Sequence, residues 1–193
     1  MTPITFELLH ERLSARPPAR IKDPWAVQAA VALVLVPAGD HFEALFIRRA
    51  EVEGDPWSGH MALPGGRRQP DDGDLADTAI RETAEETGIV LSRDQMLGEL
   101  DEYKPRAAHL PRITVRPFVF AVDRRPDIIL SDEVAESFWI PVADLQMSRR
   151  EVEIEVQGAI LKVPAFVLGA NVVWGLTERI LTPFIDLLTR PKQ

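Results

Sequence analysis

Three glutamates in the first half of the chain, Glu82, Glu85 and Glu86, have a spacing at which their side chains could do chemistry together. A helix would place all three carboxylates on one stripe of its surface. Like charges so spaced destabilise a helix by roughly 0.2–0.5 kcal/mol per pair. Hard divalent cations such as Mg²⁺ and Mn²⁺ take oxygen ligands of this kind. The spacing indicates a candidate metal site, and the plainer alternative is a solvated helix face with Arg81 paired to Glu85.

The helix that carries these glutamates is predicted from Asp74 to Thr87. At about 100° per residue, small and apolar residues fall on one half and charged residues on the other, with Glu86 at the border. Asp72 and Asp74 can cap the start of the helix, and Gly88 can supply a left-handed residue at its end. The glycine turn Gly65-Gly66 lies just upstream. An ordinary surface helix does not need such a turn, and its presence favours the functional interpretation.

The segment from Gly66 to Ile89 resembles the Nudix box, the strand-loop-helix signature of the Nudix hydrolases. The box is written G-x5-E-x7-R-E-U-x-E-E-x-G-U, with U aliphatic, and this chain departs from it at three places. Asp72 stands where the family has Glu, one extra residue precedes Arg81, and Thr83 occupies an aliphatic position. The resemblance implies an α/β fold, the Nudix-type α/β/α sandwich with a mixed β-sheet.

The resemblance also implies an activity, the hydrolysis of a nucleoside diphosphate linked to another group X with Mg²⁺ or Mn²⁺ as cofactor. Cleavage of a phosphoanhydride needs an activated water and neutralised phosphate charge, which bridging metals provide. By resemblance, Arg81 would orient the glutamates, Glu82 would be a catalytic residue, and Gly66 and Asp72 would lie at the substrate, with Asp72 reaching the metals only through water. The residues implied as metal ligands are Glu82, Glu85, Glu86 and the carbonyl of Gly65.

A second resemblance narrows the substrate. The segment from Ala44 to Gly66 is similar to the stretch that precedes the box in coenzyme A pyrophosphatases, L-L-T-x-R-[SA]-x3-R-x3-G-x3-F-P-G-G. Arg49 matches a family position and is a candidate substrate-binding residue, whereas Asp55 replaces a basic residue in a loop one residue longer. Trp174-Gly175-Leu176-Thr177 also resembles a C-terminal stretch of that subfamily. The resemblance implies coenzyme A or its derivatives as substrate, with NADH or ADP-ribose as alternatives.

Water activation needs a base, and the sequence offers more than one. Glu133 is our choice, because Ser131 to Glu136 precedes Trp139-Ile140-Pro141 and many Nudix enzymes have a further acidic residue beside the metals at such a pattern. Asp132, Glu136 and the box residue Glu82 remain alternatives.

Composition limits the classes of partner. The chain has 193 residues, a formal net charge of −8 and no cysteine. The charge argues against nucleic acid or a membrane surface as main partner, and bound cations would still allow a small-molecule nucleotide substrate. Without a signal peptide or spanning segment, cytoplasmic residence is the default expectation. A homodimer is left open.

Two other function classes were weighed on the same resemblance. A Nudix-fold nucleotide-binding regulator without catalysis would be expected to have damaged glutamates, and all three are present. An isoprenoid diphosphate isomerase of this fold depends on a cysteine, which the chain lacks.

Residues 1–193 are expected to form a single domain, with residues 1–25 as an N-terminal helical extension and residues 171–190 as a C-terminal helix. Apolar runs and turn signals predict the remaining elements. Beside the box helix, we expect helices near 5–15, 141–145 and 172–188 and strands near 26–36, 42–49, 97–103, 113–123, 134–140, 151–156 and 160–163.

Overall fold

The computed structural model describes residues 4–54, 57–105, 112–156 and 158–189. Asp55, the substituted basic position, lies outside the described residues. The helices are α1 (Phe6–Ser14), α2 (Leu75–Thr87), α3 (Val142–Ser148) and α4 (Gly175–Thr189), with a short 3-10 turn at Arg93–Gln95. The strands are β1 (Val27–Ala38), β2 (His41–Arg49), β3 (Met61–Ala62), β4 (Gly65–Arg67), β5 (Met96–Glu99), β6 (Ile113–Ala121), β7 (Val134–Pro141), β8 (Arg149–Val156), β9 (Ala159–Leu168) and β10 (Asn171–Trp174).

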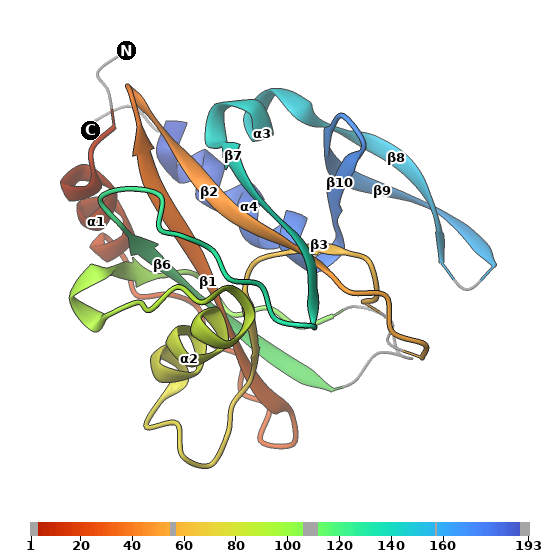
Figure 1. Ribbon diagram of the computed structural model, residues 1–193, viewed down its shortest axis with the longest axis horizontal. Helices are drawn as coiled ribbons and strands as arrows, with labels where there is room; N and C mark the ends of the chain where they lie inside the picture. Colours follow the sequence, from red (N-terminus) through yellow and green to blue (C-terminus); the bar gives the residue numbers. More distant parts are fainter. Residues whose placement is uncertain (1–3, 55–56, 106–111, 157, 190–193) are drawn as a thin grey trace.

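The main sheet is mixed and is built around β1. Among the described residues it has seven strands in the order β3-β2-β1-β6-β5, with β4 paired to β1 and β7 paired to β2. β1 runs parallel to β6 and antiparallel to β2 and β4. Where β2 leaves β1, the short strand β4 takes its place beside β1, and β3 pairs with the far end of β2 (Figure 1).

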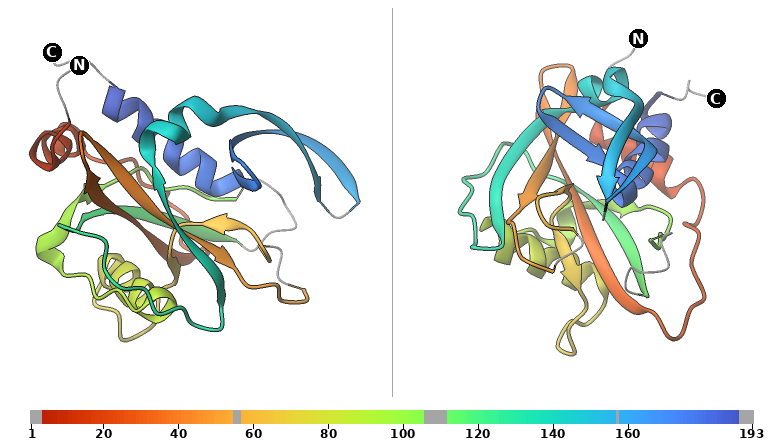
Figure 2. Two further views of the ribbon diagram at one scale, coloured as in Figure 1. Left: turned by 45° about the horizontal axis from the view of Figure 1, so that its top comes forward. Right: turned by 90° about the vertical axis from the view of Figure 1, so that its right-hand side faces the viewer.

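Alternation along β1 gives the sheet two apolar faces. Ala32 and Val34 face α2, whereas Leu33 and Leu35 face the core that α1 and α4 cover. Figure 2 shows the sheet between α2 on one side and α4 on the other. The predicted α/β/α sandwich with a mixed sheet is therefore confirmed.

The helix α2 has the ends that the sequence predicts. Asp74 caps it by accepting hydrogen bonds from the amides of Ala76 and Asp77, and Gly88 ends it at φ 72°. The buried side differs from the prediction, because Thr78 and Glu86 are buried as well. α2 packs against β4 in addition to β1, so more of its surface is covered than a two-sided helix implies.

Two predicted elements need correction at the residue level. Residues 171–174 form strand β10, and the C-terminal helix begins at Gly175 and continues through Pro183. The strand expected near 97–103 ends at Glu99, and only Tyr103 pairs again, in an isolated bridge to Val115. Among the described residues, no helix combines the length and apolar character needed to cross a bilayer.

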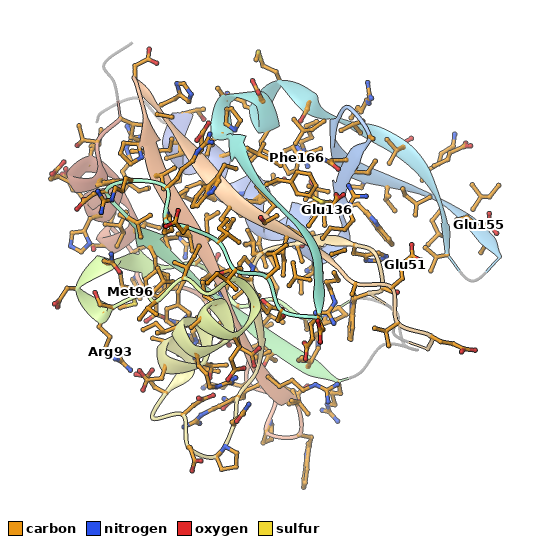
Figure 3. All side chains as sticks on the ribbon, in the orientation of Figure 1. Glu51, Arg93, Met96, Glu136, Glu155 and Phe166 are labelled. Atoms are coloured by element: carbon orange, nitrogen blue, oxygen red, sulfur yellow. The ribbon has the colours of Figure 1, made fainter. Side chains whose placement is uncertain are left out.

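A second sheet of three strands, in the order β10-β9-β8, packs against the rest of the molecule. β8 and β9 form the hairpin expected near Gly158, and their outer halves extend beyond the helices as a two-stranded ribbon (Figure 1). In Figure 3, Phe166 lies at the base of the ribbon and Glu155 near its outer end. Phe166 is buried in the core, so the ribbon is fixed at its base.

Candidate active site

The glutamate stripe of α2 lies against the glycine turn at β4. Gly65 and Gly66 pair with Val31 and Ala30 of β1, which holds the turn on the sheet. A Cβ at Gly66 would lie 2.5 Å from the carboxylate of Glu82, and a Cβ at Gly65 would lie 2.3 Å from the carbonyl oxygen of Ala30. Only glycine permits this close approach at either position. The two glycines therefore bring the backbone of β4 onto the acidic side of α2.

Glu86 is the most buried of the three glutamates, at 3% exposure. Its Oε2 accepts a hydrogen bond of 2.8 Å from the Gly65 amide. Burial, with a smaller contribution from the charges of Glu82 and Glu133, raises the pKa of Glu86 to about 7 against the lowering effect of the Gly65 amide and of Arg49. Arg49 thus lies within electrostatic reach of Glu86, although they are far apart in sequence.

Arg81 organises the other two glutamates. Its Nη1 is 2.9 Å from Glu82 Oε1 and donates a hydrogen bond of 2.8 Å to Glu85 Oε2. Burial raises the pKa of Glu82, and the ion pair with Arg81 opposes that rise. Glu85 is half-exposed. The ion pair of Arg81 with Glu85, which a solvated helix face would also have, is thus present. Arg81 also pairs with Glu82, which is less exposed.

Asp72 is buried and pairs with the edge of the Arg81 guanidinium that does not contact Glu82 and Glu85. Its carboxylate accepts hydrogen bonds from Arg81 Nε and Nη2, from the Gln69 amide and from the hydroxyl of Thr78. The bonds from Arg81, the largest cause, hold the pKa of Asp72 well below its usual range. Because protein donors occupy both oxygens, this geometry gives Asp72 a positioning role toward Arg81 and does not support the predicted contact with substrate or with metal-bound water.

Glu133 reaches the site on a loop that is fixed to the end of α2. The Ile129 amide donates to the Thr87 carbonyl and the Ser131 amide to the Glu86 carbonyl, so the loop satisfies carbonyls that the helix end leaves free. The carbonyl of Glu133 accepts from the Ala50 amide beyond β2. Glu133 is exposed, and its charge acts on both Glu82 and Glu86.

Asp132 and Glu136, the alternative bases near Glu133 in the sequence, differ from it in position. Asp132 is exposed on the same loop. Glu136 pairs with Arg48 at 3.4 Å, and the register of β2 and β7 places this pair on the face opposite Arg49. The structure therefore brings Glu133, and not Glu136, to the glutamates of α2.

The site residues named from the sequence come together, but their side chains are held by protein groups. In the part of the chain that the structure describes, no three Asp, Glu or His side chains converge as a metal shell. Glu85 turns to Arg81, and Glu86 turns to the Gly65 amide. Glu82 lies between Arg81 and Gly66.

Sequence reasoning missed one contact beside the site. The ring of His60 lies 4.8 Å from that of Trp174, at a tilt of 55°. The carbonyl of His60 accepts the Arg49 amide, which joins this ring pair to the site. The two rings are far apart in sequence and share no motif, so the chain carried no signal for the contact.

Comparisons with known proteins identify the family of the chain. Residues 26–158 match the family model of the NUDIX domain. The human mitochondrial coenzyme A diphosphatase NUDT8 is 32% identical over 199 residues, which cover 96% of this chain and 78% of that protein. An uncharacterized protein of Schizosaccharomyces pombe is 37% identical over 120 residues, which cover 60% of this chain and only 36% of its relative.

Among solved structures, a MutT/nudix family protein from Enterococcus faecalis superimposes with a TM-score of 0.59 at 18% identity. The match covers 90% of this chain and 64% of that one. The family model spans β1 to β8, and it therefore includes the glycine turn, α2 and the Glu133 loop, which form the site. The chain belongs to the Nudix hydrolase family.

Proposed function

We propose that this protein is a divalent-metal-dependent pyrophosphohydrolase that cleaves the phosphoanhydride of coenzyme A or its derivatives. The products from coenzyme A would be 3′,5′-ADP and 4′-phosphopantetheine. The observation that carries the proposal is the acidic cluster formed by the glutamate stripe Glu82, Glu85 and Glu86 of α2 against the Gly65-Gly66 turn, with Glu133 and Arg49 within electrostatic reach of Glu86. The substrate is supported by the coenzyme A pyrophosphatase-like segment that ends at Gly66 and by the similarity to human NUDT8 over nearly the whole chain.

The donor set fits Mg²⁺ or Mn²⁺. Glu82, Glu85 and Glu86 offer only carboxylate oxygens, the ligands that these ions prefer. The pKa values of Glu82 and Glu86 are raised by burial and by neighbouring negative charge, so the cluster has a surplus of negative charge that a cation would relieve. When bound, the metal would supply Lewis-acid polarisation of the phosphates and a more acidic water.

The residues around the glutamates would position the metal ligands and bind the substrate. Arg81 holds Glu82 and Glu85 in place, and Asp72 fixes Arg81. Arg49, whose charge acts on Glu86, would bind a substrate phosphate through its guanidinium group. Gly66 leaves room for the carboxylate of Glu82.

Glu133 would take the proton of the attacking water. Its exposure and its position near Glu82 and Glu86 leave its carboxylate accessible to solvent beside the cluster. Glu82 remains the alternative base, since its raised pKa also suits proton transfer.

A hydrolysis panel with Mg²⁺ or Mn²⁺ tests the substrate. It comprises coenzyme A, its thioesters, NADH, ADP-ribose and dinucleoside polyphosphates, with products separated by chromatography. We expect coenzyme A compounds to have the highest kcat/KM. Efficient cleavage of NADH or ADP-ribose with coenzyme A untouched would overturn the substrate and leave the hydrolase class intact.

A further inference from the structure

Arg49 is the last residue of β2, and neighbouring segments hold it from both sides. On one side its amide donates to the His60 carbonyl at 3.1 Å, just before β3 begins. On the other side the pairing of β2 with β7 shifts its register between Arg48 and Arg49, so that Val134 lies opposite Arg49. A β-bulge of this kind changes the direction of side chains beside it. The direction of the Arg49 guanidinium therefore depends on how this strand end is held.

His60 is the residue that holds Arg49 on the β3 side. Its amide donates to the Trp57 carbonyl at 3.2 Å, and its carbonyl accepts from Arg49. The strand that follows has only two residues, so regular pairing fixes this segment over a short length. The His60 ring lies 4.8 Å from the ring of Trp174 at a tilt of 55°, which is a favourable arrangement for aromatic rings. The ring contact therefore adds a constraint that strand pairing does not provide.

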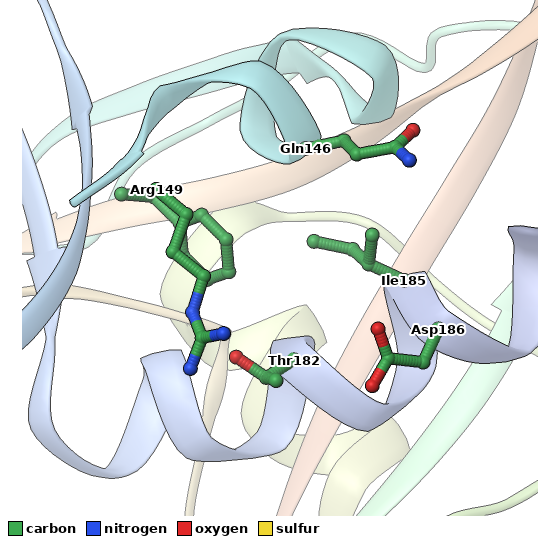
Figure 4. Close-up of a pocket in the computed structure, with 6 residues that line it drawn as sticks. Gln146, Arg149, Thr182, Ile185 and Asp186 are labelled. Atoms are coloured by element: carbon green, nitrogen blue, oxygen red, sulfur yellow. The ribbon is translucent and has the colours of Figure 1, made fainter.

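β10, which carries Trp174, is itself firmly anchored. Val173, the neighbour of Trp174 in the strand, is fully buried in the core. The second sheet is also fixed to α4, because Arg149 Nε donates to the buried carboxylate of Glu178 at 3.1 Å and Thr182 donates to the same oxygen at 2.8 Å. Figure 4 shows Arg149 beside Thr182 at the edge of a small hollow. A ring on β10 can therefore hold a loop residue in place.

A second contact joins β10 to the same end of β2. Arg48 Nη2 donates to the side-chain oxygen of Asn171, the first residue of β10. The Arg48 guanidinium also lies 5.5 Å from the centre of the Phe138 ring and 3.4 Å from a carboxylate oxygen of Glu136. These contacts hold Arg48 on the face of β2 opposite Arg49, whose charge acts on the glutamates.

We propose that Trp174 is a positioning residue for Arg49, because its contact with His60 holds the end of β2 where the Arg49 guanidinium can bind a substrate phosphate. This inference rests on the proposed function, which gives Arg49 that task. Trp174 acts through His60 and not on the substrate. Without the ring contact, His60 and the Arg49 backbone would be free to shift, which weakens a bond made in both the ground state and the transition state. Loss of such a bond raises KM and leaves kcat unchanged.

Steady-state kinetics with coenzyme A and Mg²⁺ test the role of the ring contact. Trp174→Ala and His60→Ala each remove one ring, and we expect either variant to raise KM about ten-fold, the factor that a hydrogen bond to a charged group contributes. The kcat values should stay within about two-fold of the natural one. Trp174→Phe keeps a ring in place and should retain a KM close to that of the natural protein.

Val173→Ala is the matched control. It truncates the neighbouring residue of β10, whose side chain points to the opposite face of the strand and into the core. We expect a lower thermal stability with a natural KM. The same rise of KM in Val173→Ala as in Trp174→Ala would show a general loss of packing and overturn the proposal.

A double-mutant cycle with Arg49→Ala distinguishes positioning from an independent effect. Arg49→Ala alone should raise KM at least as much as Trp174→Ala, and the two together should raise it no further. An equal rise from Trp174→Ala with and without Arg49 would overturn the proposal, because Trp174 would then act on the substrate itself. A natural KM in His60→Ala would also overturn it, and this variant decides the question if Trp174→Ala does not fold.

Calorimetry with ADP and Mg²⁺ separates this inference from the proposed function, because the same cycle can be measured as Kd without turnover. The cycle seen in Kd while coenzyme A stays uncleaved overturns the function alone. A Kd raised by Arg49→Ala and by neither ring variant overturns the role of Trp174 alone. A natural Kd in Arg49→Ala overturns the phosphate contact and, with it, the role of Trp174.

Discussion

Gly66→Ala tests the contact between the glycine turn and the glutamate stripe. The new methyl group would lie 2.5 Å from the carboxylate of Glu82, whereas ordinary contact begins at 3.4 Å. The carboxylate must therefore move by about 0.9 Å, because β4 is held by its pairing to β1. A displacement of about 1 Å in a catalytic constellation costs about 10²-fold in rate. We expect kcat to fall by about two orders of magnitude.

Gly73→Ala is the matched control. Its methyl group would lie 2.7 Å from the carboxylate of Asp77, a surface side chain near the start of the same helix that can move into solvent. We expect activity close to that of the natural protein. Initial rates at saturating substrate and metal, with thermal unfolding, provide the assay. Both variants should unfold within about 4 °C of the natural protein, as for a change near 1 kcal/mol. Natural activity in Gly66→Ala would refute the close packing of Glu82 against the turn.

Glu86→Gln should lower kcat by orders of magnitude without unfolding the protein, and full activity of the natural protein in EDTA would contradict the metal requirement. Glu133→Gln should lower kcat about 10²–10⁴-fold and leave the metal affinity nearly unchanged. The base would instead lie on α2 if Glu133→Gln kept a near-normal kcat while Glu82→Gln lost turnover and still bound the metal. Asp72→Asn should reduce the free energy of unfolding at pH 7 by about 3–5 kcal/mol, because it breaks a buried ion pair with Arg81. Folding lowers the pKa of Asp72, so the carboxylate's contribution to the free energy of unfolding is complete above the unfolded pKa near 4 and decreases below it. In denaturant unfolding, the natural protein and Asp72→Asn should therefore differ less in stability at pH 3 than at pH 7. An equal difference at both pH values would contradict this.

Local signals predicted the helix that carries the site. Asp74 and Gly88 are cap residues with known side-chain and backbone preferences, and both ends of α2 follow from them. The spacing of the glutamates needs only helical geometry. β1 and β2 were also predictable, because a long apolar run followed by a turn and a second run indicates a hairpin.

The remaining features depend on contacts between distant segments. β10 was predicted as helix because its residues continue the apolar pattern of α4, and only pairing with β9 makes them a strand. The burial of Glu86 depends on the approach of β4, and the role of Asp72 depends on Arg81 and Thr78. No periodicity in the sequence records such contacts.

The central claim is tested most directly by identifying the products from coenzyme A with Mn²⁺ and with EDTA. Chromatography of the natural protein and Glu86→Gln provides the measurement. The account predicts 3′,5′-ADP and 4′-phosphopantetheine in equal amounts, formed only by the natural protein with metal. Equal product formation in EDTA or in Glu86→Gln, or no product from coenzyme A under any condition, would contradict it.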